Sequence, residues 1–142
     1  HSRFVHFEFF RLTEAKAGLG AVGDYVGLEV NMRPAGGYTT DMTNFAHSTD
    51  VYEIWADMIT ANRRLLPDYG IHCCCAYAGR RDFHRYVHTH EEILSRYADS
   101  IVMCERLPEV MWPQMGNQMY MAKLRDQEET DAFIRFVQER VK

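Results

Sequence analysis

Polar and apolar residues alternate in two stretches near the start of the chain. Residues 4–12 (FVHFEFFRL) and 24–32 (DYVGLEVNM) both follow a period of two, which is typical of β-strands. The Ala- and Gly-rich segment between them (TEAKAGLGAVG) is typical of a hairpin connection, so the two strands are expected to pair as antiparallel neighbours. In the second strand Val26, Leu28, Val30 and Met32 form the apolar face that should point toward a core.

The pattern changes to helical spacing after the second strand. Residues 40–47 suit a short helix, and a clearer helix follows Asp50, the expected N-cap, with Glu53 three positions on. The apolar residues of this helix recur along one face: Val51, Ile54, Trp55, Met58 and Ile59. It should end before Pro67, because PDYG is typical of a turn.

Short strands follow that turn. The segments IHCCCAYAG, FHRYVH, SIVMCERL and NQMYMAKLR each suit a strand. Thr89 and Glu92 form a candidate capping box for a helix between the second and third of these strands. Asp126 and Glu129 form another for a final helix that runs to Val141.

These elements predict an α+β fold. We expect an antiparallel sheet with helices packed on it, followed by a small β-rich subdomain with a terminal helix. The turn at residues 67–70 marks the expected boundary, which divides the chain into residues 1–67 and residues 68–142.

The composition narrows the classes of protein to which the chain can belong. The chain has 142 residues, 46% of them hydrophobic and 25% charged, as expected of a globular domain with a sizeable core. A net charge of −4 gives no reason to expect general binding to nucleic acid or to an anionic membrane. No apolar run reaches the roughly 18 residues of a membrane span, and no signal-peptide pattern is present. Three of the four cysteines are consecutive, which favours a reducing, cytoplasmic location over a disulfide framework.

The polar face of the second strand carries the candidate chemistry. Glu29 and Asn31 share this face, and Glu8 on the neighbouring strand is expected to lie across from one of them. Paired carboxylates with an amide oxygen suit Mg²⁺, which prefers hard oxygen ligands and completes its shell with substrate phosphates. Glu29 could bridge two ions, with Glu8 holding one and Asn31 the other. The alternative is a solvated hairpin face whose polar residues only keep the sheet soluble.

Anion-binding features follow the same strand. Arg33 is expected to project in the same direction and to reach a phosphoryl or carboxylate oxygen through its two-pronged guanidinium. Gly36 and Gly37 would let backbone N–H groups approach an anion closely.

The paired segments HFEFF and LEVNMRPAGG resemble the C-terminal part of the ATP-grasp superfamily. There a Glu-x-Asn-x-Arg strand follows a strand that bears an acidic residue. The similarity is greatest to biotin carboxylase, carbamoyl-phosphate synthetase and the purine-pathway carboxylases. It covers residues 4–66, and beyond residue 70 only the pattern of a small β-rich C-terminal subdomain is similar. The hairpin connection is longer here than the family pattern leads one to expect.

This resemblance implies that the chain is the C-terminal fragment of an ATP-dependent carboxylate–amine or carboxylate–thiol ligase. Glu8, Glu29 and Asn31 would bind the Mg²⁺ or Mn²⁺ ions of metal–ATP. Arg33 would act in catalysis by contacting phosphate or the acyl-phosphate intermediate, and Gly36 and Gly37 would line the nucleotide site.

Several parts of such a site are not visible in the sequence. A Lys-bearing strand, a Gly-rich loop over the phosphates and an adenine pocket are expected in an N-terminal portion of a longer protein. This chain alone is therefore expected to be inactive. The expected partners of the intact enzyme are ATP and a small carboxylate, and its oligomeric state stays open, a homodimer included. The alternative class is a non-catalytic α+β interaction domain with a solvated acidic hairpin.

Other residue groups allow two interpretations each. Residues 72–75 (HCCC) suggest zinc, but consecutive strand residues point to opposite faces, and buried cysteines acting as small hydrophobes are favoured. For the histidines, no acidic or Cys partner is spaced to complete a metal site; these are His84, His88 and His90.

A group of methionines with one tryptophan could line a hydrophobic groove or pack around a turn; these are Met111, Met115, Met119, Met121 and Trp112.

Overall fold

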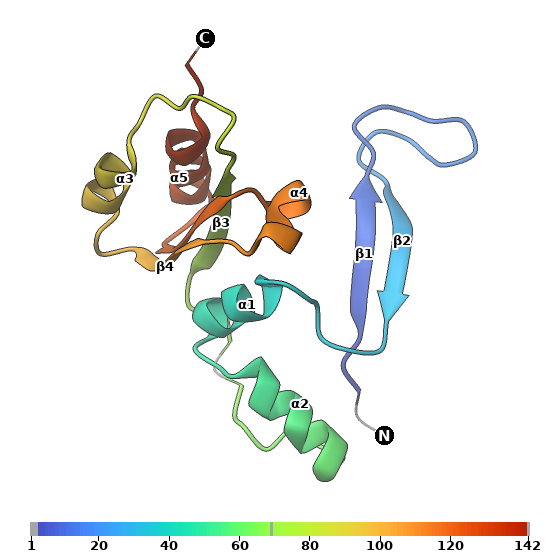
Figure 1. Cartoon of the computed structure of the whole chain (residues 1–142). Helices are drawn as coiled ribbons and strands as arrows, with labels where there is room; N and C mark the ends of the chain where they lie inside the picture. Colours follow the sequence, from blue (N-terminus) through green and yellow to red (C-terminus); the bar gives the residue numbers. More distant parts are fainter. Residues whose placement is uncertain (1–2, 69, 142) are drawn as a thin grey trace. The chain divides into compact units, whose positions relative to one another are not determined.

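The computed structural model describes residues 3–68 and 70–141 and has an α+β fold, as predicted (Figure 1). It contains two antiparallel sheets and five α-helices. The chain divides into two compact units, each described here by itself. The first comprises the chain up to Thr40 together with Asp50–Pro67, and the second comprises Asp41–Thr49 together with the chain from Asp68 onward.

The first unit is built on the predicted hairpin. Strands β1 (His6–Arg11) and β2 (Tyr25–Asn31) pair in antiparallel register, with Glu8 directly opposite Glu29. The register shifts between Glu8 and Phe9, so one extra residue of β2 is accommodated as a bulge. Both strands predicted by alternation are therefore confirmed.

The apolar side of this hairpin is not the core-facing surface that alternation predicts. Phe7, Phe9, Leu28 and Val30 are each more than half exposed. A two-stranded ribbon buries a face only if another layer packs against it, and the described residues of the first unit supply no such layer.

Helix α2 (Val51–Thr60) begins where the sequence predicts. The Asp50 carboxylate accepts hydrogen bonds from the backbone N–H groups of Tyr52 and Glu53, at 2.8 and 3.1 Å. The helix ends at Thr60, earlier than the expected limit at Pro67, because the chain turns through a positive φ of 55° at Asn62.

The preceding helix, α1 (Thr39–His47), agrees with the predicted residues 40–47. Near its start the Thr40 hydroxyl donates to the Ala35 carbonyl, at 2.9 Å.

The second unit contains a three-stranded antiparallel sheet with the order β3-β5-β4. Its strands are β3 (Cys74–Arg80), β4 (Ile101–Arg106) and β5 (Gln118–Leu124). Helices α3 (His90–Arg96) and α5 (Gln127–Gln138) contribute to a core on one face of the sheet. The fully packed members of that core are Ala76, Ala78, Ile93, Tyr120, Ala122, Leu124, Phe133 and Val137.

Helix caps in this unit follow the sequence closely. The capping box of Thr89 and Glu92 at α3 is confirmed, with both reciprocal hydrogen bonds present. At α5 the Asp126 side chain accepts from the Glu129 N–H, as predicted, but the Glu129 carboxylate returns to the N–H of Arg125 instead of Asp126.

The predicted strand FHRYVH is wrong. Residues 83–88 form turns and bends, with one isolated bridge between Tyr86 and Arg140. Both edges of β5 are already occupied by β3 and β4, and Phe83 is 75% exposed, so the alternation here does not reflect a buried face. A 3₁₀ turn, η1 (Glu109–Met111), and the short helix α4 (Trp112–Met115) precede β5.

No helix in the described ranges has both the length and the apolar character that a membrane crossing requires.

Candidate functional site

Two carboxylates face each other across the hairpin. Glu8 of β1 and Glu29 of β2 are direct cross-strand partners, and such partners project from the same face of a sheet. Both side chains are open to solvent to a substantial degree, 43% in the case of Glu8. The structure therefore brings these two predicted residues together on one accessible face.

Asn31 and His6 extend the same face by one further pair. His6 lies directly opposite Asn31, and its Nε2 is 3.4 Å from Oε1 of Glu8. The Asn31 amide Nδ2 donates to Oε1 of Glu29, which leaves the Asn31 carbonyl oxygen available as a ligand. We call His6, Glu8, Glu29 and Asn31 the polar quartet.

The polar quartet offers the oxygen ligands that a hard divalent cation prefers. Proteins usually bind Mg²⁺ through one or two carboxylates, and substrate phosphates supply further oxygen ligands. The polar quartet offers two carboxylates and one carboxamide oxygen, which suits this mode of binding. In the described part of the chain no three His, Cys, Asp or Glu side chains form a metal site by themselves. A cation at the polar quartet would therefore draw on Asn31 and on groups of its own substrate.

The remaining predicted residues lie past the end of the strand. β2 ends at Asn31, so strand alternation does not extend to Arg33, and the guanidinium of Arg33 donates to the Pro34 carbonyl at 2.9 Å. Gly36 and Gly37 follow in the loop that leads to α1, and Gly37 has a positive φ of 58°. Anion binding by Arg33, Gly36 and Gly37 remains a prediction.

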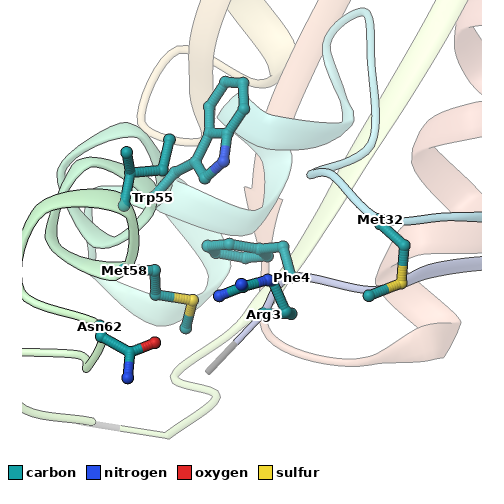
Figure 2. A pocket seen from close by; sticks show the side chains of 7 residues that line it. Arg3, Phe4, Met32, Trp55, Met58 and Asn62 are labelled. Carbon is teal, nitrogen blue, oxygen red and sulfur yellow. The ribbon is translucent and has the colours of Figure 1, made fainter. Parts of the chain in front are cut away.

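A cavity of about 520 Å³ lies next to this end of the hairpin, within the first unit (Figure 2). Met32, which follows the polar quartet in the chain, lines it from one side, and side chains of α2 line it from the other. The sequence marked Trp55, Met58 and Ile59 only as the apolar stripe of a helix. That stripe is in part the wall of this cavity, and Ile59 is 69% exposed. The full lining is Arg3, Phe4, Met32, Trp55, Met58, Ile59 and Asn62.

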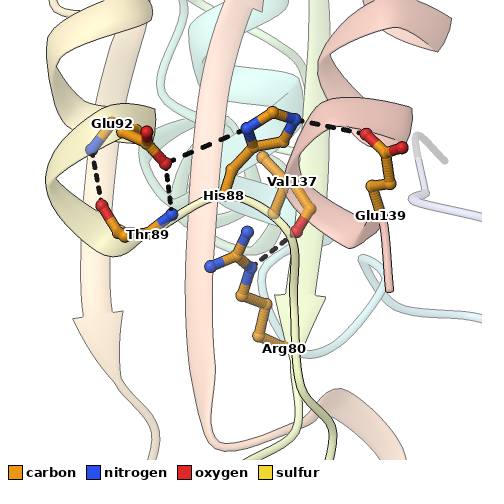
Figure 3. A network of polar contacts seen from close by, with 6 residues as sticks. All are labelled: Arg80, His88, Thr89, Glu92, Val137 and Glu139. Atoms are coloured by element: carbon orange, nitrogen blue, oxygen red, sulfur yellow. Dashed lines mark hydrogen bonds and ion pairs between the residues drawn. The ribbon is translucent and has the colours of Figure 1, made fainter. Parts of the chain in front are cut away.

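The three histidines considered as metal ligands do not share one environment. His88 stacks on Phe136 with ring centroids 3.5 Å apart, and its Nε2 lies 3.2 Å from Oε2 of Glu139 (Figure 3). His84 and His90 instead line a separate cavity at one end of the second sheet.

The cysteines of HCCC are free thiols of intermediate burial. Cys74 packs against the core, whereas Sγ of Cys73 lies 3.7 Å from the Phe45 carbonyl. Burial, reinforced by the neighbouring Cys73, raises the pKa of the Cys75 thiol to about 11. A thiol of this kind is poorly disposed to ionise as a metal ligand or nucleophile near neutral pH.

The methionines fall into two pairs, one fully buried and one partly buried. Met119 and Met121 are fully buried in β5, so these two are packing residues. Met111 and Met115 are partly buried around the η1–α4 turn.

Comparison of the chain with protein-family models gives no match, and comparison with curated protein sequences gives none either.

Proposed function

We propose that this chain supplies the metal- and phosphate-binding hairpin of an ATP-dependent ligase of the ATP-grasp type. In this proposal Glu8, Glu29 and Asn31 hold Mg²⁺ on the phosphates of ATP, and Arg33 contacts the transferring phosphoryl group. The intact enzyme would transfer the γ-phosphate of ATP to a carboxylate. An amine or thiol would then displace phosphate from the acyl phosphate.

The register of the hairpin is the observation that carries the proposal. Glu8 is paired directly with Glu29, and His6 with Asn31, so the predicted ligands share one accessible face. A register slip of one residue would have placed Glu8 on the opposite face and separated the carboxylates. The resemblance of HFEFF and LEVNMRPAGG to the ATP-grasp superfamily supports the same proposal from the sequence.

The chemistry requires little more of these side chains than position and charge. Phosphoryl transfer is catalysed mainly by orienting the reactants and neutralising the charge on the transferring group. Two carboxylates that hold metal ions, and a guanidinium beyond them, would meet that requirement once a nucleotide is bound by other parts of the enzyme.

The test is a kinetic comparison in the full-length protein that carries this chain. Glu29→Gln removes the shared negative charge but keeps the shape of the side chain. We expect carboxylate-dependent ATP turnover to fall by roughly two to three orders of magnitude, as for loss of a main electrostatic contribution. The melting temperature should change little, because the side chain is exposed.

Glu14→Gln is the matched control. Glu14 lies in the connection of the same hairpin, is 73% exposed, and forms an ion pair with Lys16 at 3.5 Å. Its substitution should leave turnover unchanged. Near-normal turnover in Glu29→Gln would contradict the ligase proposal and favour the interaction-domain alternative.

A further inference from the structure

A second cavity lies at one end of the three-stranded sheet, wholly within the second unit, and has a volume of about 390 Å³. Its wall includes one cross-strand row: Arg80 of β3 and Arg106 of β4 both pair with Gln118 of the central strand β5. Directly paired residues project from the same face, so two guanidinium groups flank Gln118 on one side of the sheet.

Arg80 is the unusual member of this row, because it is only 8% exposed. Its Nε donates to the Val137 carbonyl in the last turn of α5, at 2.6 Å (Figure 3). Its guanidinium carbon lies 4.4 Å from the centre of the Tyr86 ring and 5.8 Å from the centre of the Tyr120 ring. In the described ranges no carboxylate forms an ion pair with Arg80, and its Nη2 has no hydrogen-bond partner.

A buried cation without a counter-ion is costly to keep. Removing a charge from water costs several kcal/mol unless an opposite charge or a full set of hydrogen bonds compensates. Burial accordingly lowers the pKa of Arg80, although the group remains protonated at neutral pH. The two tyrosine rings and the Val137 carbonyl offset part of this cost, but none of them carries a negative charge, so Arg80 has no counter-ion among the described residues.

The other cations of the cavity are held in place by protein groups. Arg106 forms two hydrogen bonds with the Asp82 carboxylate, at 2.7 and 2.6 Å. Arg81 donates to the carbonyls of Trp112 and Pro113, at 2.8 and 2.9 Å. Guanidinium groups anchored in this way lose little further freedom when a ligand arrives.

The lining of this cavity is positively charged, whereas the chain as a whole is negatively charged. Three arginines line the cavity, and Asp82 is its one carboxylate among the described residues, whereas the net charge of the whole chain is −4. The buried Tyr120 and His90 also line the cavity, and Nδ1 of His90 lies 2.8 Å from the Tyr120 hydroxyl. Arginine clusters with neighbouring hydroxyl and amide groups are typical of sites for phosphate and carboxylate groups.

We propose that this cavity binds the oxyanion of a small molecule, a phosphate ester or a carboxylate. The ligand supplies the negative charge that Arg80 lacks and contacts Arg106 at the other end of the row. This site does not depend on the proposed ligase function, because it shares no residue with the hairpin.

The test is a titration of the whole chain followed by NMR of backbone amides and arginine Nε–H groups. The probes are inorganic phosphate, glycerol phosphate and succinate, each added at constant ionic strength maintained with chloride. We expect saturable binding with a Kd of about 1 mM or tighter. The largest shifts should fall on Arg80, Arg106 and Gln118.

The choice of probe distinguishes the two ligand classes. Saturation by inorganic phosphate or glycerol phosphate but not succinate assigns the site to phosphate groups, and the reverse result assigns it to carboxylates. Saturation by none of the three, or shifts confined to other parts of the chain, would overturn the proposal.

Substitutions test the residues themselves. Arg106→Gln should weaken binding at least about tenfold, as expected for loss of a charged hydrogen-bonding partner. Arg80→Lys keeps the charge but loses the planar fork, and should weaken binding with the fold retained, as checked by its amide spectrum. The control is Arg125→Gln, which removes another arginine paired with a carboxylate, Glu129, outside the cavity.

The control must leave the affinity unchanged. Equal weakening by Arg125→Gln and Arg106→Gln would show nonspecific screening and would overturn the proposal. If Arg80→Lys fails to fold, the ligand affinities of Arg106→Gln and Arg125→Gln can still be compared, and that comparison tests the proposal.

Discussion

The guanidinium of Arg106 forms a two-pronged contact with the carboxylate of Asp82 in the lining of the second cavity. The hydrogen bonds from Arg106 favour the charged form of the carboxyl group and hold the pKa of Asp82 below its ordinary value. A carboxyl group whose pKa is lowered by folding stabilises the folded state above its unfolded pKa. That contribution is lost as the pH falls through the folded pKa.

Arg106→Gln should therefore raise the pKa of Asp82 toward its ordinary value. Titration of the side-chain carboxyl carbon by ¹³C NMR measures this directly. Arg125→Gln is a suitable control, because it should raise the pKa of Glu129, which is lowered by Arg125, and leave Asp82 unchanged. An unchanged Asp82 titration in Arg106→Gln would mean that the pair does not persist in solution.

At the scale of elements, the contact between β3 and α4 depends on a glycine. A Cβ atom at Gly79 would overlap the carbonyl oxygen of Met115, the last residue of α4. The same carbonyl accepts a hydrogen bond from the Tyr77 hydroxyl at 2.9 Å, so it cannot withdraw without breaking that bond. The close approach of strand and helix therefore requires the absence of a side chain.

Gly79→Ala should lower the free energy of unfolding by about 2 kcal/mol or more, because the added methyl group meets backbone atoms. Urea denaturation followed by far-ultraviolet circular dichroism measures the loss. Gly27→Ala is the control: this strand glycine of β2 has open space around its Cβ position, so its substitution should change stability by less than about 1 kcal/mol. Similar losses in both variants would contradict the packing argument.

At the scale of the whole molecule, apolar side chains are covered very unevenly. The second unit buries a continuous core between its sheet and helices. The hairpin of the first unit instead exposes aromatic side chains on its apolar face, where Phe7 and Phe9 stack with centroids 6.0 Å apart and Phe9 meets Tyr25 edge to face. Exposed apolar faces next to unpaired strand edges are prone to association.

We expect the isolated chain to self-associate as its concentration rises, and Phe9→Glu to reduce this association. A charge on the exposed sheet face opposes close contact between copies. Sedimentation velocity over a range of concentrations gives the measurement. Val110→Glu is the control, since Val110 is 84% exposed in the other unit and belongs to no aromatic cluster. A wild-type chain that stays monomeric throughout would contradict the prediction.

Local signals account for what could be predicted about the fold. The caps at Asp50, Thr89 and Asp126 were readable because an N-cap side chain bonds to backbone groups only two or three residues away. The shared face of Glu8 and Glu29 was readable because an antiparallel hairpin joins strands that are neighbours in sequence. In each case both partners of the interaction lie close together in the sequence, so a local pattern is enough to predict them.

The sequence by itself therefore determined most of the helices and strands, the α+β class and the acidic face of the hairpin. Only the tertiary structure decided that FHRYVH is a loop, that the apolar face of the hairpin is exposed, and that Arg80, Gln118 and Arg106 form one row. The row depends on the strand order β3-β5-β4, which brings together residues far apart in the chain. Burial and long-range pairing depend on what packs against a segment, and alternation along the chain describes only the segment itself.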